Sequence, residues 1–284
     1  MGSGSFSSTS FYNYSRSTGK SVDTNSGRVS GQEYKARSMD ALLNPKNVTR
    51  ECCNSEEHPN TVPVILALDV TGSMGAACKE TAEALGVIMT DLYKKFKDVQ
   101  IMVMGIGDLA YDRAPIQISQ FESDVRIAEW LDKIYMEHGG GGNGYESYTA
   151  AWYMGSRHCK LDCWNQGRKG IIITMGDEPL NPYLPAAPLN ATTGDHVEGK
   201  GIETTELYKE AIKKYDIFHI AIEDRSSSSD CYKEHVDDSF KKVLGERYFV
   251  STIQKLGDTI CKCIENSVEN KSISDMSDGN GISW

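Results

Sequence analysis

The chain has 284 residues and a formal net charge of −10, and 39% of its residues are hydrophobic. This length and apolar content allow either one large α/β domain or two small ones. No apolar stretch approaches the ~20 residues that a membrane-spanning helix requires, so we expect no membrane partner.

The N-terminus lacks two common targeting signals. It has no apolar signal-peptide core, and Phe6 stands where a myristoylation motif requires Ser or Thr. Eight cysteines in a chain without a secretory signal are typical of reduced thiols. We therefore expect a bacterial cytoplasmic or virion setting.

Positive charge is concentrated near the N-terminus. Residues 1–50 contain seven Lys or Arg and three Asp or Glu, a net charge of +4, which leaves −14 for residues 51–284. The first thirty residues are rich in Ser, Thr, Gly and Asn, a composition that does not build a core of its own. Two interpretations stay open: a disordered tail, or an arm that orders against an acidic neighbour such as a second copy of the chain. Seven scattered charges without a recognised motif do not predict nucleic-acid binding.

If the arm orders, we expect its cations to contact acidic surface on a neighbouring subunit while its aromatic side chains act as apolar anchors. These residues are Arg16, Lys20, Arg28, Lys35 and Arg37, with Phe6, Phe11, Tyr12 and Tyr14. We divide the chain into a basic arm over 1–60, a domain over 61–266 and a C-terminal tail over 267–284.

Apolar periodicity predicts alternating strands and helices. We expect strands over 62–69, 99–106, 170–175, 216–222 and 247–250, a short antiparallel edge strand over 115–119, and helices over 74–97, 121–135, 145–158, 203–214, 231–243 and 252–265. This alternation is typical of a doubly wound, mostly parallel α/β sheet with helices on both faces, as in Rossmann-like folds. The connection over 176–202 contains four prolines and is too long for a simple turn, so we expect a functional rim.

Three oxygen-bearing side chains follow the first buried strand. Asp69, Thr71 and Ser73 come directly after the apolar residues 62–68, around Gly72. Ligands of parallel sheets bind outside the carboxyl ends of the strands, so we expect these side chains to face one point there, with the Asp69 carboxylate toward solvent. Oxygen-only ligation suits Mg²⁺, Mn²⁺ or Ca²⁺ better than zinc.

The segment from Asp69 to Ser73 resembles the metal-ion-dependent adhesion site of von Willebrand factor type A domains. Two further segments match in the order that this family requires: 138–147 resembles a Gly-rich second metal loop, and 171–179 resembles the strand and acidic loop that close the site. The resemblance covers residues 60–265 and implies a von Willebrand factor A-like fold. It also implies that the Thr71 and Ser73 hydroxyls bind the ion, with Asp69 and Asp177 contributing directly or through water.

The second loop departs from the family pattern. Asn143 stands where the family usually has Thr or Asp, and an amide oxygen is a poorer ligand for a cation than a carboxylate. Either Glu146 or Ser147 takes its place, or the site has one charge fewer. The candidate metal ligands are therefore Asp69, Thr71, Ser73, Asn143, Glu146, Ser147 and Asp177, with Mg²⁺, Mn²⁺ or Ca²⁺ as the cofactor.

The resemblance implies a module that recruits another protein. Two carboxylates leave Mg²⁺ unsaturated, so an Asp or Glu of the partner fills the open position. The alternative is a structural assembly protein, for example a phage virion component, whose arm docks on neighbouring subunits. We do not expect an enzyme, because no nucleophile–base order and no phosphate-binding loop accompanies the motif. Asp108 and Asp112 follow the next strand, and either support the rim of the site or lie in a solvated loop.

Overall fold

The computed structural model describes residues 4–137, 142–223 and 229–277, with side chains up to residue 269. Among these residues, six strands form one central sheet in the order β12-β11-β8-β4-β5-β6. Every neighbouring pair is parallel except β5 and β6. The strands are β4 (Val62–Asp69), β5 (Val99–Ile106), β6 (Ile116–Glu122), β8 (Gly170–Gly176), β11 (Tyr215–Ile222) and β12 (Tyr248–Ser251). The predicted doubly wound α/β fold is confirmed.

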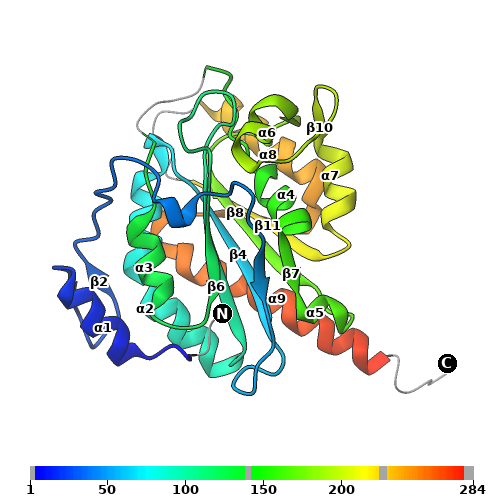
Figure 1. The fold of residues 1–284 in the computed structure, drawn as a ribbon. Coiled ribbons are helices and arrows are strands. Elements are labelled where there is room, and N and C mark those ends of the chain that lie inside the picture. The colour runs from blue at the N-terminus through cyan, green and yellow to red at the C-terminus, as the bar shows by residue number, and fades with distance from the viewer. Residues whose placement is uncertain (1–3, 138–141, 224–228, 278–284) are drawn as a thin grey trace.

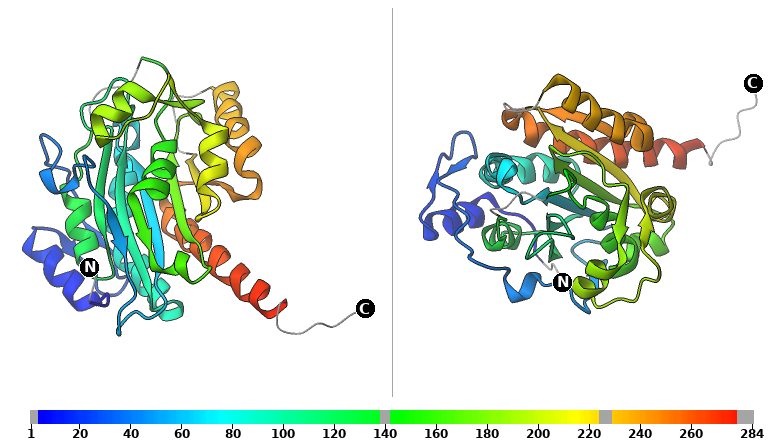
Figure 2. Two further views of the ribbon diagram at one scale, coloured as in Figure 1. Left: turned by 45° about the vertical axis from the view of Figure 1, so that its right-hand side comes forward. Right: turned by 90° about the horizontal axis from the view of Figure 1, so that it is seen from above.

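Helices cover both faces of this sheet (Figure 2). One layer contains α2 (Gly75–Lys95), α3 (Arg126–Lys133) and α9 (Leu256–Ser277), and the other contains α4 (Thr149–His158), α7 (Thr204–Ala211) and α8 (Asp230–Leu244). Successive strand residues point to opposite faces, so Leu66 belongs to the core under α2 while Ile65 belongs to the core under α4. Because both faces are buried, β4 has to be apolar along nearly its whole length.

Three predicted helices differ in their boundaries. The segment expected as a helix over 121–135 begins as the end of β6, and α3 starts only at Arg126, whose backbone N–H donates to the Asp124 carboxylate at 3.0 Å. The helix expected from 145 starts at Thr149, because Ser147 is held against the preceding loop by its N–H bond to Gly107 O at 3.2 Å. The last helix starts at Leu256, four residues later than expected, and runs on to Ser277.

The connection over 176–202 is folded. It contains β9 (Tyr183–Pro185) and β10 (Gly201–Glu203), which pair antiparallel, and α6 (Ala186–Thr193) between them. This unit lies over the end of the sheet at the top of Figure 1. The remaining short elements outside the N-terminal arm are β7 (Cys159–Leu161), α5 (Asp162–Asn165), η2 (Gly72–Met74), η3 (Gly245–Arg247) and η4 (Ile253–Lys255).

The N-terminal arm is ordered against its own domain. It forms α1 (Ser8–Ser17), β1 (Ser21–Val22) and β2 (Val29–Ser30), which lie beside α2 and α3 (Figure 1). Phe11 is 1% exposed, and its ring lies so close to α2 that a Cβ added at Gly86 would be 2.5 Å from Phe11 Cε1. The arm thus adds apolar side chains to a core that the domain supplies, and the disordered-tail interpretation does not apply to residues 4–60.

Two of the arm's cations pair with carboxylates of the α/β domain, and Lys35 pairs with Glu33 within the arm itself at 3.1 Å. Lys20 Nζ lies 2.6 Å from the Asp132 carboxylate, and Arg28 Nη2 lies 2.7 Å from that of Glu80. We expected these cations to contact a neighbouring subunit, and for these two the acidic surface is that of their own domain. Docking of the arm on a neighbouring subunit stays a prediction.

The later part of the arm covers the β6 edge of the sheet. It contains η1 (Ala41–Leu43) and β3 (Arg50–Cys52), which pairs in parallel with β7. Arg50 Nη2 donates to Ile118 O on β6 at 3.0 Å. Covering part of an edge strand in this way hinders its pairing with a strand of another chain.

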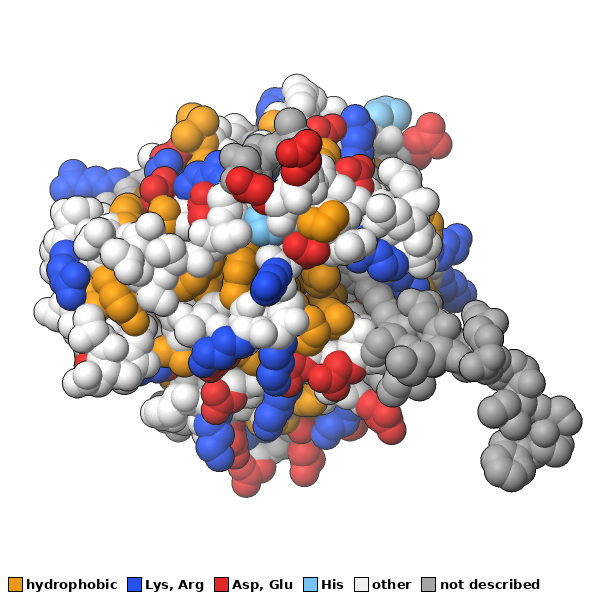
Figure 3. Space-filling model, turned by 90° about the horizontal axis from the view of Figure 1, so that it is seen from below, with side chains coloured by type: hydrophobic (Ala, Val, Ile, Leu, Met, Phe, Trp, Pro, Cys, Tyr) orange, Lys and Arg blue, Asp and Glu red, His pale blue; other side chains and the backbone are white. Residues whose placement is uncertain are grey.

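Charge is mixed on the face opposite the rim. Seen from below, Lys and Arg side chains alternate with Asp and Glu, and apolar side chains lie between them (Figure 3). This face therefore does not form the continuous basic patch typical of nucleic-acid binding. Within the described residues, no helix is both long enough and apolar enough to cross a membrane.

We predict that Phe11→Ala lowers the free energy of unfolding by about 3 kcal/mol, because it leaves a cavity between the arm and α2. Denaturant unfolding followed by circular dichroism measures this change. Tyr111→Ala removes a ring that is 60% exposed and serves as the control, with a change within about 0.5 kcal/mol. An unchanged stability of Phe11→Ala would show that the arm does not contribute to the core.

Candidate metal site

The candidate site lies at the carboxyl ends of β4 and β8, two neighbouring strands. Asp69 is the last residue of β4, and η2 follows it with Thr71 as its N-cap. Met74 is buried, which anchors the turn before α2 begins at Gly75. The turn is therefore held between a buried strand and a buried helix start.

The Asp69 carboxylate is buried, contrary to our expectation that it faces solvent. Asp69 is 0% exposed. Its Oδ1 accepts hydrogen bonds from the Thr71 N–H at 2.9 Å and from the Thr71 hydroxyl at 2.6 Å, and its Oδ2 accepts one from the Tyr148 hydroxyl at 2.7 Å. A buried charge needs such donors, and here they fix the position of the first loop.

The second pair of predicted ligands also meets. The exposed Ser73 hydroxyl donates to Asp177 Oδ1 at 3.1 Å, although the two residues are 104 positions apart. Asp177 directly follows β8, so the pairing of β4 with β8 brings their ends together. Four of the predicted residues, Asp69, Thr71, Ser73 and Asp177, thus lie at one edge of the sheet.

Tyr148 is a site residue that sequence reasoning missed. Its hydroxyl donates to Asp69 and accepts the Glu178 N–H at 3.2 Å, so it joins the first and third loops. The residue before Asp177 has to be glycine for this contact, because a Cβ at Gly176 would lie 1.9 Å from the Tyr148 hydroxyl. Gly176 was the available signal, but a glycine at a strand end does not reveal which side chain needs the space.

The residues of the second loop point in different directions. Asn143 is exposed, and its Oδ1 accepts the Tyr145 N–H at 3.0 Å. The Ser147 hydroxyl accepts the Leu109 N–H at 3.0 Å, which turns it toward the β5–β6 connection. Glu146 is 5% exposed, and its Oε2 has no hydrogen-bond partner within the described residues. Which of the three completes the site stays a prediction, and the glycines at 139–141 lie outside the described residues.

The carboxylates of this region raise one another's pKa values. Burial raises the pKa of Asp69, and the neighbouring charge of Asp177 raises it further. Burial likewise raises the pKa of Glu146, together with the charges of Asp69 and Asp112. Burial raises the pKa of Asp112 to about 6. A cation bound among these groups would reverse this effect, because it favours their ionised forms.

The residues present fit an oxygen-ligated divalent cation. Among the described residues, no three Asp, Glu, His or Cys side chains are grouped so as to hold a metal. The candidate set instead combines carboxylates with hydroxyls. The Thr71 and Ser73 hydroxyls each donate their proton to a carboxylate, so their oxygen lone pairs stay available to a cation. The unpartnered Glu146 Oε2 is a further oxygen that lacks a donor.

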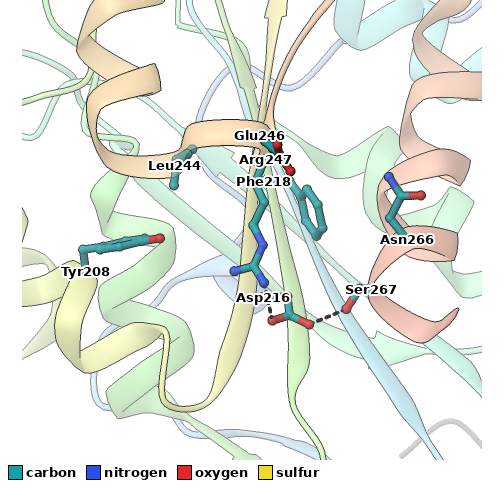
Figure 4. A pocket seen from close by; sticks show the side chains of 8 residues that line it. All are labelled: Tyr208, Asp216, Phe218, Leu244, Glu246, Arg247, Asn266 and Ser267. Carbon is teal, nitrogen blue, oxygen red and sulfur yellow. Dashed lines mark hydrogen bonds and ion pairs between the residues drawn. The ribbon is translucent and has the colours of Figure 1, made fainter. Parts of the chain in front are cut away.

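A separate pocket of about 420 Å³ lies at the other end of β11, away from these loops (Figure 4). Asp216 lies at its centre, and both carboxylate oxygens are engaged, one by Arg247 Nη2 at 3.2 Å and one by the Ser267 hydroxyl at 2.6 Å. These contacts join β11 to η3, which directly precedes β12, and to α9. We therefore interpret the Asp216 cluster as a structural link.

We predict that Glu146→Gln stabilises the protein in the presence of a chelator, and increasingly so at higher pH. Since burial raises the folded pKa of Glu146 above its unfolded value of 4.5, the unfolded chain loses the proton first. Stability then falls as pH rises above 4.5, and the Gln variant lacks this loss. Denaturant unfolding at pH 5 and pH 8 should show a gain of roughly 1–3 kcal/mol at pH 8 and a smaller one at pH 5.

The control is Glu203→Gln, which removes one exposed carboxylate from the same rim and should change stability by less than about 0.5 kcal/mol. A Glu146→Gln variant that is less stable than the parent at pH 8 would contradict the assignment of Glu146 as a buried carboxyl group without a partner.

Comparisons with known proteins give a distant likeness in structure. No protein-family model matches the chain, and no curated protein matches it. The chain is similar to the pilus adhesin SpaC of Lactobacillus rhamnosus GG in its open conformation, with 13% identity and a TM-score of 0.49, over 78% of this chain and 31% of the adhesin. A second structure of that adhesin gives 14% identity and a TM-score of 0.47, over 78% and 32%. The chain thus spans about a third of the adhesin's length, and a likeness of this size does not assign a function.

Proposed function

We propose that the chain is a divalent-cation-dependent protein-binding module of the von Willebrand factor A type. Thr71, Ser73 and Asp177 would hold the cation, and Asp69 would contribute directly or through water. The proposal assigns the chain a binding function, and gives no residue a catalytic role.

The observation that carries the proposal is the pairing of hydroxyls with carboxylates across two loops. Thr71 donates to Asp69, and Ser73 donates to Asp177. Each hydroxyl proton points at a carboxylate, so each oxygen can turn its lone pairs to a cation without losing a hydrogen bond. A hydroxyl whose lone pairs accepted a hydrogen bond would have to give up that bond before it could bind the ion.

Bound here, a divalent cation would supply an open coordination position for a carboxylate of another protein. This chain's own residues set the direction of approach. Ser73 is exposed, whereas Asp69 is buried beneath Tyr148 and Thr71, so the open side of the site faces outward past Ser73. A partner Asp or Glu would gain more Coulomb energy at such a position than a neutral group.

We predict that Ser73→Ala weakens Mn²⁺ or Mg²⁺ binding on the order of tenfold or more. The substitution removes one metal ligand and the hydroxyl that donates a hydrogen bond to Asp177. Isothermal titration calorimetry measures the affinity. Since Ser73 is exposed, the unfolding free energy in EDTA should change by less than about 0.5 kcal/mol.

The matched control is Ser38→Ala, which removes an exposed hydroxyl of the arm and should leave the affinity unchanged. If Ser73→Ala and the parent bind the metal equally, or if the parent shows no saturable binding, the site assignment is wrong. A calorimetric loss in the Ser73 variant with no loss in the control supports it.

A further inference from the structure

A pocket of about 280 Å³ lies beside the candidate metal site. Its walls come from the β5–β6 connection, the loop before α4 and the connection that leads into β9. Its lining includes Asp108, Tyr145, Ser147, Pro182, Tyr183 and Pro185. Ser147 ties the pocket to the metal site, because it lies between Glu146 and Tyr148 in the chain.

Asp108 lines this pocket, and one oxygen of its buried carboxylate makes no hydrogen bond among the described residues. Asp108 is 2% exposed, so it does not lie in the solvated loop that was one of our two interpretations. Its Oδ1 accepts the Ala110 N–H at 2.8 Å. The Asn143 side chain, which also lines the pocket, stabilises the ionised carboxylate and partly opposes the rise in its pKa that burial causes. The Asp108 Oδ2 is buried and makes no geometric hydrogen bond within the described part of the chain. A buried acceptor left in this state is destabilising, so a ligand that donates to it gains this energy back on binding.

The lining of the pocket indicates the chemical class of that ligand. Pro182, Pro185 and two tyrosine rings offer apolar contact, and Tyr183 is 44% exposed. The carboxylate is the charged group among these walls. An aliphatic stem that ends in a cationic donor matches both parts, and Lys and Arg side chains have this form. The tyrosine faces add attraction for a cation.

A second metal ion fits the pocket less well. The neighbouring carboxylate of Asp112 is turned to the backbone, because its Oδ2 accepts the Asp108 N–H at 2.7 Å. Asp108 would then be the lone carboxylate ligand with a free oxygen in the pocket, whereas hard divalent cations bind through several oxygens. One organic cation needs one such acceptor.

We propose that the Asp108 pocket binds a Lys or Arg side chain of the same protein partner that gives its carboxylate to the metal. This inference rests on the proposed function for the identity of the partner. The pocket then selects partners in which a basic residue lies close to the metal-binding Asp or Glu, and the metal alone does not determine specificity.

The test uses the full chain in EDTA and three small probes: N-acetyl-arginine methylamide, N-acetyl-lysine methylamide and N-acetyl-citrulline methylamide. Citrulline has nearly the shape of arginine without its charge. In a ¹H–¹⁵N NMR titration, we expect the two cationic probes to shift the amide signals of Ala110, Tyr145 and Tyr183 saturably, and the citrulline probe to bind at least about tenfold more weakly.

Asp108→Asn keeps the size of the side chain and removes its charge, and it should lower the affinity for the arginine probe by about tenfold or more. Glu203→Gln removes a rim carboxylate that does not line the pocket, and it should leave the affinity unchanged. Equal binding of arginine and citrulline by the parent chain overturns the proposal, and this comparison holds even if the Asp108 variant does not fold. Since EDTA removes divalent cations, a failure here is distinct from a failure of the metal site.

Discussion

The Asp69 carboxylate lies at the buried end of β4, where an ionised group without donors would cost several kcal/mol. Three hydrogen bonds offset this cost, two from Thr71 and one from the Tyr148 hydroxyl. Because Tyr148 also accepts a bond from the backbone of Glu178, one buried carboxylate sets the relative positions of three loops. The geometry at Ser73 and Asp177 depends on this arrangement.

The same edge of the sheet contains more buried carboxyl groups than the fold needs for its own stability. Burial and mutual repulsion raise the pKa values of Asp69 and Glu146, and one oxygen each of Glu146 and Asp108 has no partner among the described residues. Unused acceptors of this kind are a cost that packing alone does not explain. The two proposed cations, a metal at the hydroxyl pairs and a basic side chain of a partner at Asp108, would account for them.

Much of this edge could be predicted from the sequence, because buried parallel strands leave long apolar runs and their ends share one side of the sheet. That logic placed Ser73 near Asp177. It could not place Tyr148, because no local sequence pattern shows where a tyrosine hydroxyl lies in the fold. It also could not predict that Asp108 is buried. The arm was harder still: its composition excludes a core of its own, but a single ring such as Phe11 can enter a core that α2 already provides.

The central claim is that a divalent cation binds between the ends of β4 and β8. The most direct measurement is anomalous X-ray diffraction from crystals grown with Mn²⁺, recorded near the manganese absorption edge. The claim predicts an anomalous peak within about 2.0–2.4 Å of the Ser73 and Thr71 hydroxyl oxygens, the range expected for oxygen ligands of such ions. A crystal with manganese elsewhere on the chain, or with the Ser73–Asp177 hydrogen bond intact and no peak beside it, would contradict the claim.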